Sequence, residues 1–507
     1  MLIAYRLRST AAPIRSWTGA RSILTTGLHF GTPSATAAND AEAEGGVTHH
    51  DAYKLGTPFA AVAGADSAST SASTDDSNAS TTKRTYSVLP HRTNLTSRLW
   101  LDRFDRNNSE YKRLIESGTS AESAQPAPRS PATFKPRKLV LKHMRDSYVS
   151  EQLPFATNPH VREEYVSFYG GIRIAKLLED LDAMAGSISY THCDDETPET
   201  PPLTIVTASV DRIDLLRRPT LNQDINISGM VTYVGHSSME ITINVEGKNT
   251  DNGGVVDPIL RARFTMVARD PITNKAVQVN PLVLENDAEK KLFAMGAELK
   301  ASKKLASTQS LTKAPPTPEE RLVIHDLWLQ SKKYDQGNLP DHLVWMEDTK
   351  VHSLHITQPQ DRNIHNFIFG GYLMRQAFEI AHATASLYSK NHPIFLAMDD
   401  IWFRKPVPIG SILALTSQVV YSRAHKDKGG SFQVKVTADI RDPITGTSET
   451  SNTFNYTFAV PSTDSKRPPA IMPRTYGDAV EYLDGKRRLE LGLEMARENS
   501  SQLLELW

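Results

Sequence analysis

The feature that most constrains the fold of this 507-residue chain is an internal duplication that begins near residue 137. In each copy an aromatic-Gly-Gly step, at 169–171 and 369–371, precedes a stretch in which apolar residues recur at helical spacing. Segments of alternating apolar and polar residues follow each helical stretch. The pattern predicts two similar units, and the chain is long enough to give each unit its own core.

The duplicated pattern predicts matching elements in the two copies. Short extended segments are expected at 144–148 and 346–350, and central helices at 174–186 and 373–385. The alternating segments, which are typical of half-buried antiparallel strands, are 203–213, 224–234, 238–245 and 260–268 in the first copy and 394–401, 412–421, 431–438 and 451–459 in the second. An early strand, one helix and a four-strand meander give a curved sheet wrapped around a helix. The expected fold class is therefore α+β, with two tandem hotdog domains.

Changes of composition divide the rest of the chain. The first 39 residues contain four arginines and no acidic residue, which is typical of a cleaved mitochondrial presequence. The segment that follows is dominated by Ala, Ser, Thr, Gly and Pro and is expected to be disordered, except that 92–118 is compatible with a short docking helix. The expected divisions are 1–30 (presequence), 31–136 (low-complexity and linker region), 137–285 (first hotdog domain), 286–340 (helical connector), 341–465 (second hotdog domain) and 466–507 (tail with a helix).

Charge and composition narrow the classes of function. The formal net charge is −1, so no overall field favours nucleic acid or an anionic membrane as a partner. The single cysteine, Cys193, excludes an internal disulfide framework and fits a reducing compartment. No apolar run approaches the roughly 20 residues that span a bilayer, so no membrane span is expected. The histidines His352, His355 and His365 lack a Cys or acidic partner at ligand spacing, so no metal site is expected.

The two copies differ in a complementary way at two polar positions. The first helix carries Asp182. When the two helices are aligned on their Ala-rich second halves, the equivalent residue of the second helix is Phe378. The loop before the second Gly-Gly step carries Asn363, whereas 161–166 in the first copy offers no amide. Helix acids usually lie on a solvated face, and Asn is common where a loop enters a helix. Taken together, the two differences predict that only one groove between the copies holds both a carboxylate and an amide.

In each copy a pair of basic residues lies at the end of the first strand after the helix. These pairs are Arg217 with Arg218 and Arg404 with Lys405. They are either solvated strand ends or a clamp for phosphate groups, which arginine suits geometrically. Both interpretations remain open at the level of the sequence.

Several separate blocks between about residues 138 and 488 resemble the double-hotdog acyl-CoA thioesterases, of the mitochondrial acyl-CoA thioesterase 9 type. The most specific blocks are Leu178-Glu-Asp-Leu-Asp182, Val206-Thr-Ala-Ser-Val-Asp-Arg-Ile-Asp214, Pro359-Gln-Asp-Arg-Asn363, Phe369-Gly-Gly-Tyr-Leu-Met-Arg375, Ala397-Met-Asp-Asp-Ile-Trp-Phe-Arg-Lys-Pro406 and Tyr482-Leu-Asp-Gly485. The first 130 residues lie outside the resemblance.

The resemblance implies hydrolysis of fatty acyl-CoA to free fatty acid and coenzyme A, in the mitochondrion. It implies that a helix Asp and a loop Asn come from opposite hotdog units, which places these roles on Asp182 and Asn363. We expect Asp182 to act as general base on water, Asn363 to orient the water or the thioester, and backbone N–H groups near Gly371 to receive the oxyanion. No cofactor is expected, because coenzyme A is itself part of the substrate. The basic side chains expected to hold its phosphates are Arg217, Arg218, Arg404 and Lys405.

Two alternatives remain open. The series Asp361-x-Asn363-x-His365 is similar to the Asp and His of hotdog enoyl-CoA hydratases, although the His falls one residue short of their spacing. A non-catalytic acyl-CoA-binding protein with degenerate sites is the other alternative. In every case the expected partners are the acyl-CoA ligand and further copies of the chain, because hotdog pairs commonly form homo-oligomers.

Overall fold

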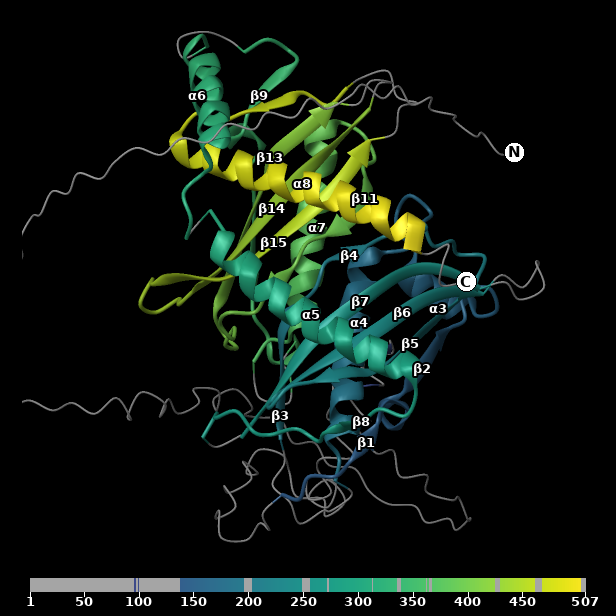
Figure 1. Ribbon diagram of the computed structural model, residues 1–507. Coiled ribbons are helices and arrows are strands. Elements are labelled where there is room, and N and C mark those ends of the chain that lie inside the picture. Colours follow the sequence, from purple (N-terminus) through teal and green to yellow (C-terminus); the bar gives the residue numbers. More distant parts are fainter. Residues whose placement is uncertain are drawn as a thin grey trace, which may run out of the picture. The chain divides into compact units, whose positions relative to one another are not determined.

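The computed structural model describes most of the chain beyond residue 136 and three residues before it (Figure 1). The described residues are 95, 96, 99, 137–195, 203–248, 256–270, 273–311, 313–334, 339–361, 363, 367–424, 429–460 and 467–502. The expected presequence at 1–30 and almost all of the expected low-complexity and linker region at 31–136 lie outside them.

Two six-stranded antiparallel sheets form the body of the described chain. In spatial order the first contains β12 (Ile401–Trp402), β3 (Thr204–Val210), β7 (Val256–Arg269), β6 (Ser238–Lys248), β5 (Asp224–Val234) and β2 (Val149–Leu153). The second contains β10 (Val351–Ile356), β13 (Ile412–Ala424), β14 (Gly430–Arg441), β15 (Ser448–Val460), β11 (Ile394–Met398) and β4 (Ile213–Asp214). The expected α+β class is confirmed, but only three strands of each sheet form a meander. The strand after each helix, β3 or β11, pairs with the last strand of its meander.

The two halves exchange a short strand. β12 leaves the second half and pairs with β3, with Ile401 opposite Val210. β4 leaves the first half and pairs with β11, with Ile213 opposite Met398. Each sheet is therefore completed by the other half of the chain.

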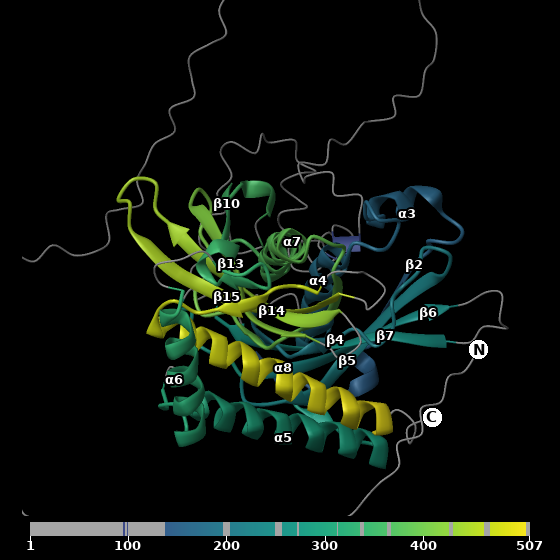
Figure 2. The same cartoon turned by 90° about the horizontal axis from the view of Figure 1, so that it is seen from above.

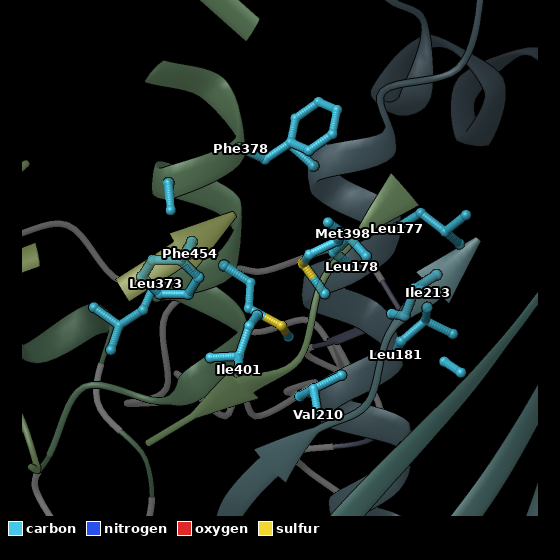
Figure 3. Close-up of a cluster of buried hydrophobic side chains, with 14 of the residues drawn as sticks. Leu177, Leu178, Leu181, Val210, Ile213, Leu373, Phe378, Met398, Ile401 and Phe454 are labelled. Carbon is cyan, nitrogen blue, oxygen red and sulfur yellow. The ribbon is translucent and has the colours of Figure 1, made fainter. Parts of the chain in front are cut away.

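One long helix covers the inner face of each sheet, α4 (Ile174–Cys193) in the first half and α7 (Gly370–Ser389) in the second. The two helices pack against each other. Apolar side chains from both helices and from the exchanged strands meet in one continuous core, as Figure 3 shows for Leu181, Ile213, Leu373 and Ile401. The two halves thus share one hydrophobic core.

Two further helices lie on the opposite side of the sheets from α4 and α7 (Figure 2). α5 (Asp287–Gln309) packs on the first sheet and α8 (Tyr476–Gln502) on the second, while α6 (Pro318–Lys332) packs against α8. A β-carbon on Gly296 of α5 would lie 2.6 Å from Cβ of Tyr233, and one on Gly485 of α8 would lie 2.9 Å from Cβ of Tyr421. Glycine lets both helices approach their sheets closely.

The expected extended segments at 144–148 and 346–350 are wrong. These residues form the 3₁₀ turns η2 (Met144–Ser147) and η4 (Glu347–Thr349), and the strands begin after them. In each turn a hydroxyl donates back to a backbone carbonyl, from Ser147 to Met144 at 2.9 Å and from Thr349 to Met346 at 2.7 Å. Such local bonds compete with a strand ladder and explain the turns.

Short elements complete the fold. Two parallel pairs, β1 (Lys142–His143) with β8 (Leu282–Val283) and β9 (Leu343–Trp345) with β16 (Ala470–Met472), form separate two-stranded sheets, and α3 (Pro159–Tyr165) and η5 (Pro359–Asp361) precede the central helices. Within the region compatible with a docking helix, Leu95, Thr96 and Leu99 are helical and buried. The backbone N–H of Thr96 donates to the buried Asp180 carboxylate of α4 at 3.1 Å. Leu95, Thr96 and Leu99 are therefore part of the folded body.

Candidate active site

The loops before α4 and α7 fix which residues of the two halves correspond. The N–H of Asn363 donates to the carbonyl of Phe367 at 2.6 Å, and the Phe367 N–H donates to Oδ1 of Asn363 at 3.1 Å. Ser167 and Gly171 repeat both bonds, at 2.7 and 3.1 Å. Ser167 is thus the counterpart of Asn363, which agrees with the expected loss of the amide from the first half.

The expected equivalence of the two Gly-Gly steps is wrong. Gly170 has a φ of +79° and lies in the loop before α4, whereas Gly370 and Gly371 are the first residues of α7. Because α4 and α7 each contain 20 residues, their first residues match and Ala175 is the counterpart of Gly371. The same register pairs Asp182 with Phe378, as the sequence predicts.

Asp182 of the first half lies against the amino-terminal end of α7 from the second half. Its Oδ2 accepts a hydrogen bond from the N–H of Gly371 at 2.7 Å, and its Oδ1 accepts one from Oγ1 of Thr207 at 2.8 Å. The side chain is 5% exposed. A β-carbon on Gly371 would lie 2.9 Å from the carbonyl oxygen of Glu179, so only glycine permits this approach. The buried carboxylate is held by two donors and by the positive end of a helix.

Asn363 belongs to the loop that leads into the same helix end. The residue is half-buried. The loop closes on α7 through a 3.4 Å hydrogen bond from the N–H of Phe369 to the carbonyl of Asp361. Asp182 and Asn363 therefore both lie at the amino-terminal end of α7, one from each half, while His365 lies outside the described residues.

An ion pair between a buried glutamate and a half-buried arginine joins the two central helices beside Asp182. Glu179 is 2% exposed and accepts a hydrogen bond from Nη1 of Arg375 at 2.9 Å. Burial disfavours the Arg375 cation, but Glu179 and Glu379 outweigh this effect and raise its pKa. This pair therefore joins α4 to α7 near the carboxylate.

The basic residues divide between two places. Arg404 and Lys405 follow β12, beside the first sheet and Thr207, and both are exposed. Lys405 forms an ion pair with Glu449. Arg217 and Arg218 follow β4, beside the counterpart position in the second sheet, and Arg217 pairs with Asp257. Lys405 thus contacts β15, and Arg217 contacts β7.

The counterpart of the Asp182 position is filled by aromatic rings. Phe378 is buried, and its ring lies 5.1 Å from that of Phe395 in an edge-to-face arrangement. Phe395 stands where Thr207 stands in the first half, because both precede the bulge of the strand after the helix. An apolar cluster therefore replaces the carboxylate and its hydroxyl donor.

Thr207 is the functional residue that the sequence did not indicate. It lies in an alternating strand segment, where a threonine is ordinary. The signal was the contrast with Phe395, which becomes visible only when the bulges set the register.

Within the described ranges no cluster of three or more His, Cys, Asp or Glu side chains is arranged to hold a metal ion. Among the described helices, none combines the length and hydropathy of a membrane-spanning segment.

The chain is similar to several curated proteins, although no protein-family model matches it. Acyl-coenzyme A thioesterase 9, mitochondrial, of Mus musculus is 40% identical over 370 residues, which are 72% of this chain and 80% of that protein. The Homo sapiens protein of the same name is 39% identical over 353 residues, 68% of this chain and 77% of that protein. A solved acyl-CoA hydrolase of Staphylococcus aureus in complex with butyryl coenzyme A is 26% identical over 32% of this chain and 97% of that one, with a TM-score of 0.29.

Proposed function

The chain belongs to the family of the mitochondrial acyl-CoA thioesterases 9 and 10, and we propose that it hydrolyses acyl-CoA at one composite centre built by both halves. The enzyme is an acyl-CoA thioester hydrolase, and with its mouse, bovine and human relatives it is assigned to the mitochondrion. The observation that carries the proposed centre is the 2.7 Å hydrogen bond from the Gly371 N–H to Asp182. It joins a carboxylate of one half to the helix end of the other.

In the proposed mechanism Asp182 is the general base. It takes a proton from water as the water oxygen attacks the thioester carbonyl, and the proton passes to the coenzyme A sulfur as the C–S bond breaks. Asn363 orients the water or the thioester. Thr207 holds Oδ1 of Asp182 and so fixes the direction of the carboxylate. Direct attack by the carboxylate is less favoured, because both of its oxygens already accept hydrogen bonds.

Gly371 has a single backbone N–H, and Asp182 accepts its hydrogen bond. We propose that the carbonyl oxygen of the bound substrate takes over this hydrogen bond as it becomes an oxyanion. Oδ2 of Asp182 is then released toward water. The positive end of α7 stabilises the negative charge both when Asp182 accepts the Gly371 N–H and when the oxyanion accepts it.

Further parts of the proposal concern the substrate and the assembly. Arg404 and Lys405 follow β12, which pairs with the strand that carries Thr207, and we assign them to the phosphates of coenzyme A in preference to Arg217 and Arg218. Each six-stranded sheet with its central helix is proposed to be one of two tandem hotdog domains. Homo-oligomers of the chain are also proposed.

The test is thiol release from a panel of acyl-CoA substrates. Wild type is expected to release thiol, and Asp182→Asn to lose about 10²-fold or more of kcat, as expected when a general base is removed. Asn363→Ala is expected to lower the same rate. Phe378→Leu, at the counterpart of Asp182, is the matched control and should keep turnover within a few-fold of wild type.

Other outcomes would favour other functions. Hydration of an enoyl-CoA without thiol release would favour the hydratase. Tight binding of acyl-CoA without turnover would favour a binding protein. If Asp182→Asn folded and kept most of the wild-type activity, Asp182 would not be the general base, although the chain would still be a thioesterase.

A further inference from the structure

The exchanged strand β12 carries an aromatic ring to the composite centre. Trp402 pairs with Ser209, and the N–H of Phe403 donates to the carbonyl of Ala208 at 3.0 Å. Phe403 therefore stands next to Thr207, the residue that holds Asp182. Its ring is half-buried, so part of it remains accessible to a ligand.

The ring and the carboxylate border the same small space above Gly370. A β-carbon on Gly370 would lie 3.1 and 3.3 Å from Cζ and Cε1 of Phe403, and 3.2 Å from Oδ2 of Asp182. All three contacts are tighter than ordinary van der Waals separation. Gly370 precedes Gly371, whose N–H is the proposed oxyanion donor. The base, the helix end and one aromatic edge thus pack closely around Gly370, and a methyl group there would crowd both the ring and the carboxylate.

The other half shows the same backbone geometry with other residues at these positions. Leu215 is the counterpart of Phe403, because its N–H donates in the same way to Leu396 at 2.8 Å. Ile174, the first residue of α4, stands in the place of Gly370. A branched residue therefore begins the central helix of that half, whereas the residue beside Asp182 is glycine.

We propose that Phe403 is a specificity-determining residue, whose ring limits the bulk on the acyl carbon next to the thioester carbonyl. The inference rests on the proposed function and deepens it. A carbonyl that reaches the Gly371 N–H places its substituents in the space between Phe403 and Gly370. The sulfur carries no branch, so the acyl carbon is the only substituent whose bulk varies between substrates. A straight chain presents a methylene there, whereas a 2-methyl-branched chain presents an additional methyl group to the ring.

The experiment compares straight-chain and 2-methyl-branched acyl-CoA of equal carbon number, for example butyryl-CoA and isobutyryl-CoA. Wild type is expected to favour the straight chain in kcat/KM by about tenfold or more, the usual discrimination for one methyl group in a tight pocket. Phe403→Ala should reduce that preference by about tenfold, and Phe403→Leu by less. Leu215→Ala, at the counterpart position, is the matched control and should leave the preference unchanged.

A second pair of variants tests the space itself. Gly370→Ala should lower kcat/KM for the straight-chain substrate by about tenfold, because the new methyl group competes with the carbonyl. The double variant Gly370→Ala/Phe403→Leu should have a kcat/KM for the straight-chain substrate about threefold or more above that of Gly370→Ala, since the two positions are in contact.

The outcomes separate this inference from the proposed function. No thiol release by wild type would overturn the function. An unchanged preference in active Phe403→Ala and Phe403→Leu would overturn the specificity role alone. Loss of turnover with both substrates in variants that melt like wild type would also overturn it, because the ring would then serve the reaction and not the selection.

Discussion

At the scale of single residues, the proposed base depends on the two donors that hold it. Gly371 fixes Oδ2 of Asp182 through the backbone, which a side-chain substitution cannot remove. Thr207 fixes Oδ1 through a hydroxyl, which can be removed without changing the shape of the site. Thr207 is therefore the residue at which the orientation of the carboxylate can be tested separately from its presence.

Thr207→Val is expected to lower kcat by about tenfold, because the carboxylate loses one of its two donors and so its fixed direction. Thr207→Ser keeps the hydroxyl and should stay within about threefold of wild type. The measurement is the steady-state rate of thiol release with one acyl-CoA, together with the melting temperature of each variant. Equal rates for the valine and serine variants would show that the hydroxyl does not orient Asp182.

At the scale of elements, the approach of α5 and α8 to the sheets depends on one glycine each. Gly485 is the clearer case, because a β-carbon there would lie 2.9 Å from both Tyr421 and Val420. Gly477 lies on the same helix, and a β-carbon there would meet only Oγ1 of Thr475 at 3.6 Å. Gly477 is therefore a control for Gly485 on the same helix.

Gly485→Ala is expected to lower the free energy of unfolding by about 1–3 kcal/mol, the usual cost of overpacking a well-packed contact. Gly477→Ala should be neutral or slightly stabilising, because alanine is the better helix former. Chemical denaturation of the two variants and wild type measures the difference. A loss of the same size at both positions would place the cost in the helix and not in its contact with Tyr421.

The elements also show which parts of the fold and of the candidate site could be predicted from the sequence. Alternation and helical spacing located the strands and both central helices, because those patterns follow directly from which faces are buried. The match of Asp182 with Phe378 was also predicted. The Gly-Gly alignment was wrong because Gly170 serves a left-handed loop position and Gly371 a close helix contact, two different needs met by the same residue type. Thr207 and the exchanged strands depend on register between distant segments, which no local pattern records.

At the scale of the whole molecule, the exchange of β4 and β12 joins the two halves, and the proposed centre takes residues from both. The first half supplies Asp182 and Thr207, and the second supplies Asn363, Gly371 and Phe403. The counterpart position holds Phe378 and Phe395, so one centre has kept its polar groups while the other has become core. Fusing the halves in one chain is what permits this asymmetry, because two identical subunits would carry the same residues at both positions.

The segment before the first half adds a further link, through a buried acid. Asp180 is completely buried, and its carboxylate accepts hydrogen bonds from Thr96 and from the hydroxyl of Tyr165. Burial raises its pKa from 3.8 to about 6, and these hydrogen bonds only partly oppose the rise. The folded chain therefore binds a proton at Asp180 more tightly than the unfolded chain does. This contribution to stability is complete below about pH 4 and is lost as the pH rises through about 6.

Asp180→Asn should remove this pH dependence, because an amide carries no charge at either end of the range. Relative to the variant, wild type is expected to lose up to about 3 kcal/mol of its free energy of unfolding between about pH 4 and about pH 6. Denaturant unfolding across that range measures the difference, and the exposed Glu163→Gln serves as the control that should follow wild type. A difference between wild type and Asp180→Asn that stayed constant with pH would mean that the acid titrates alike in both states. The hydrogen bonds from Thr96 would then hold the Asp180 carboxyl without any change in its affinity for a proton.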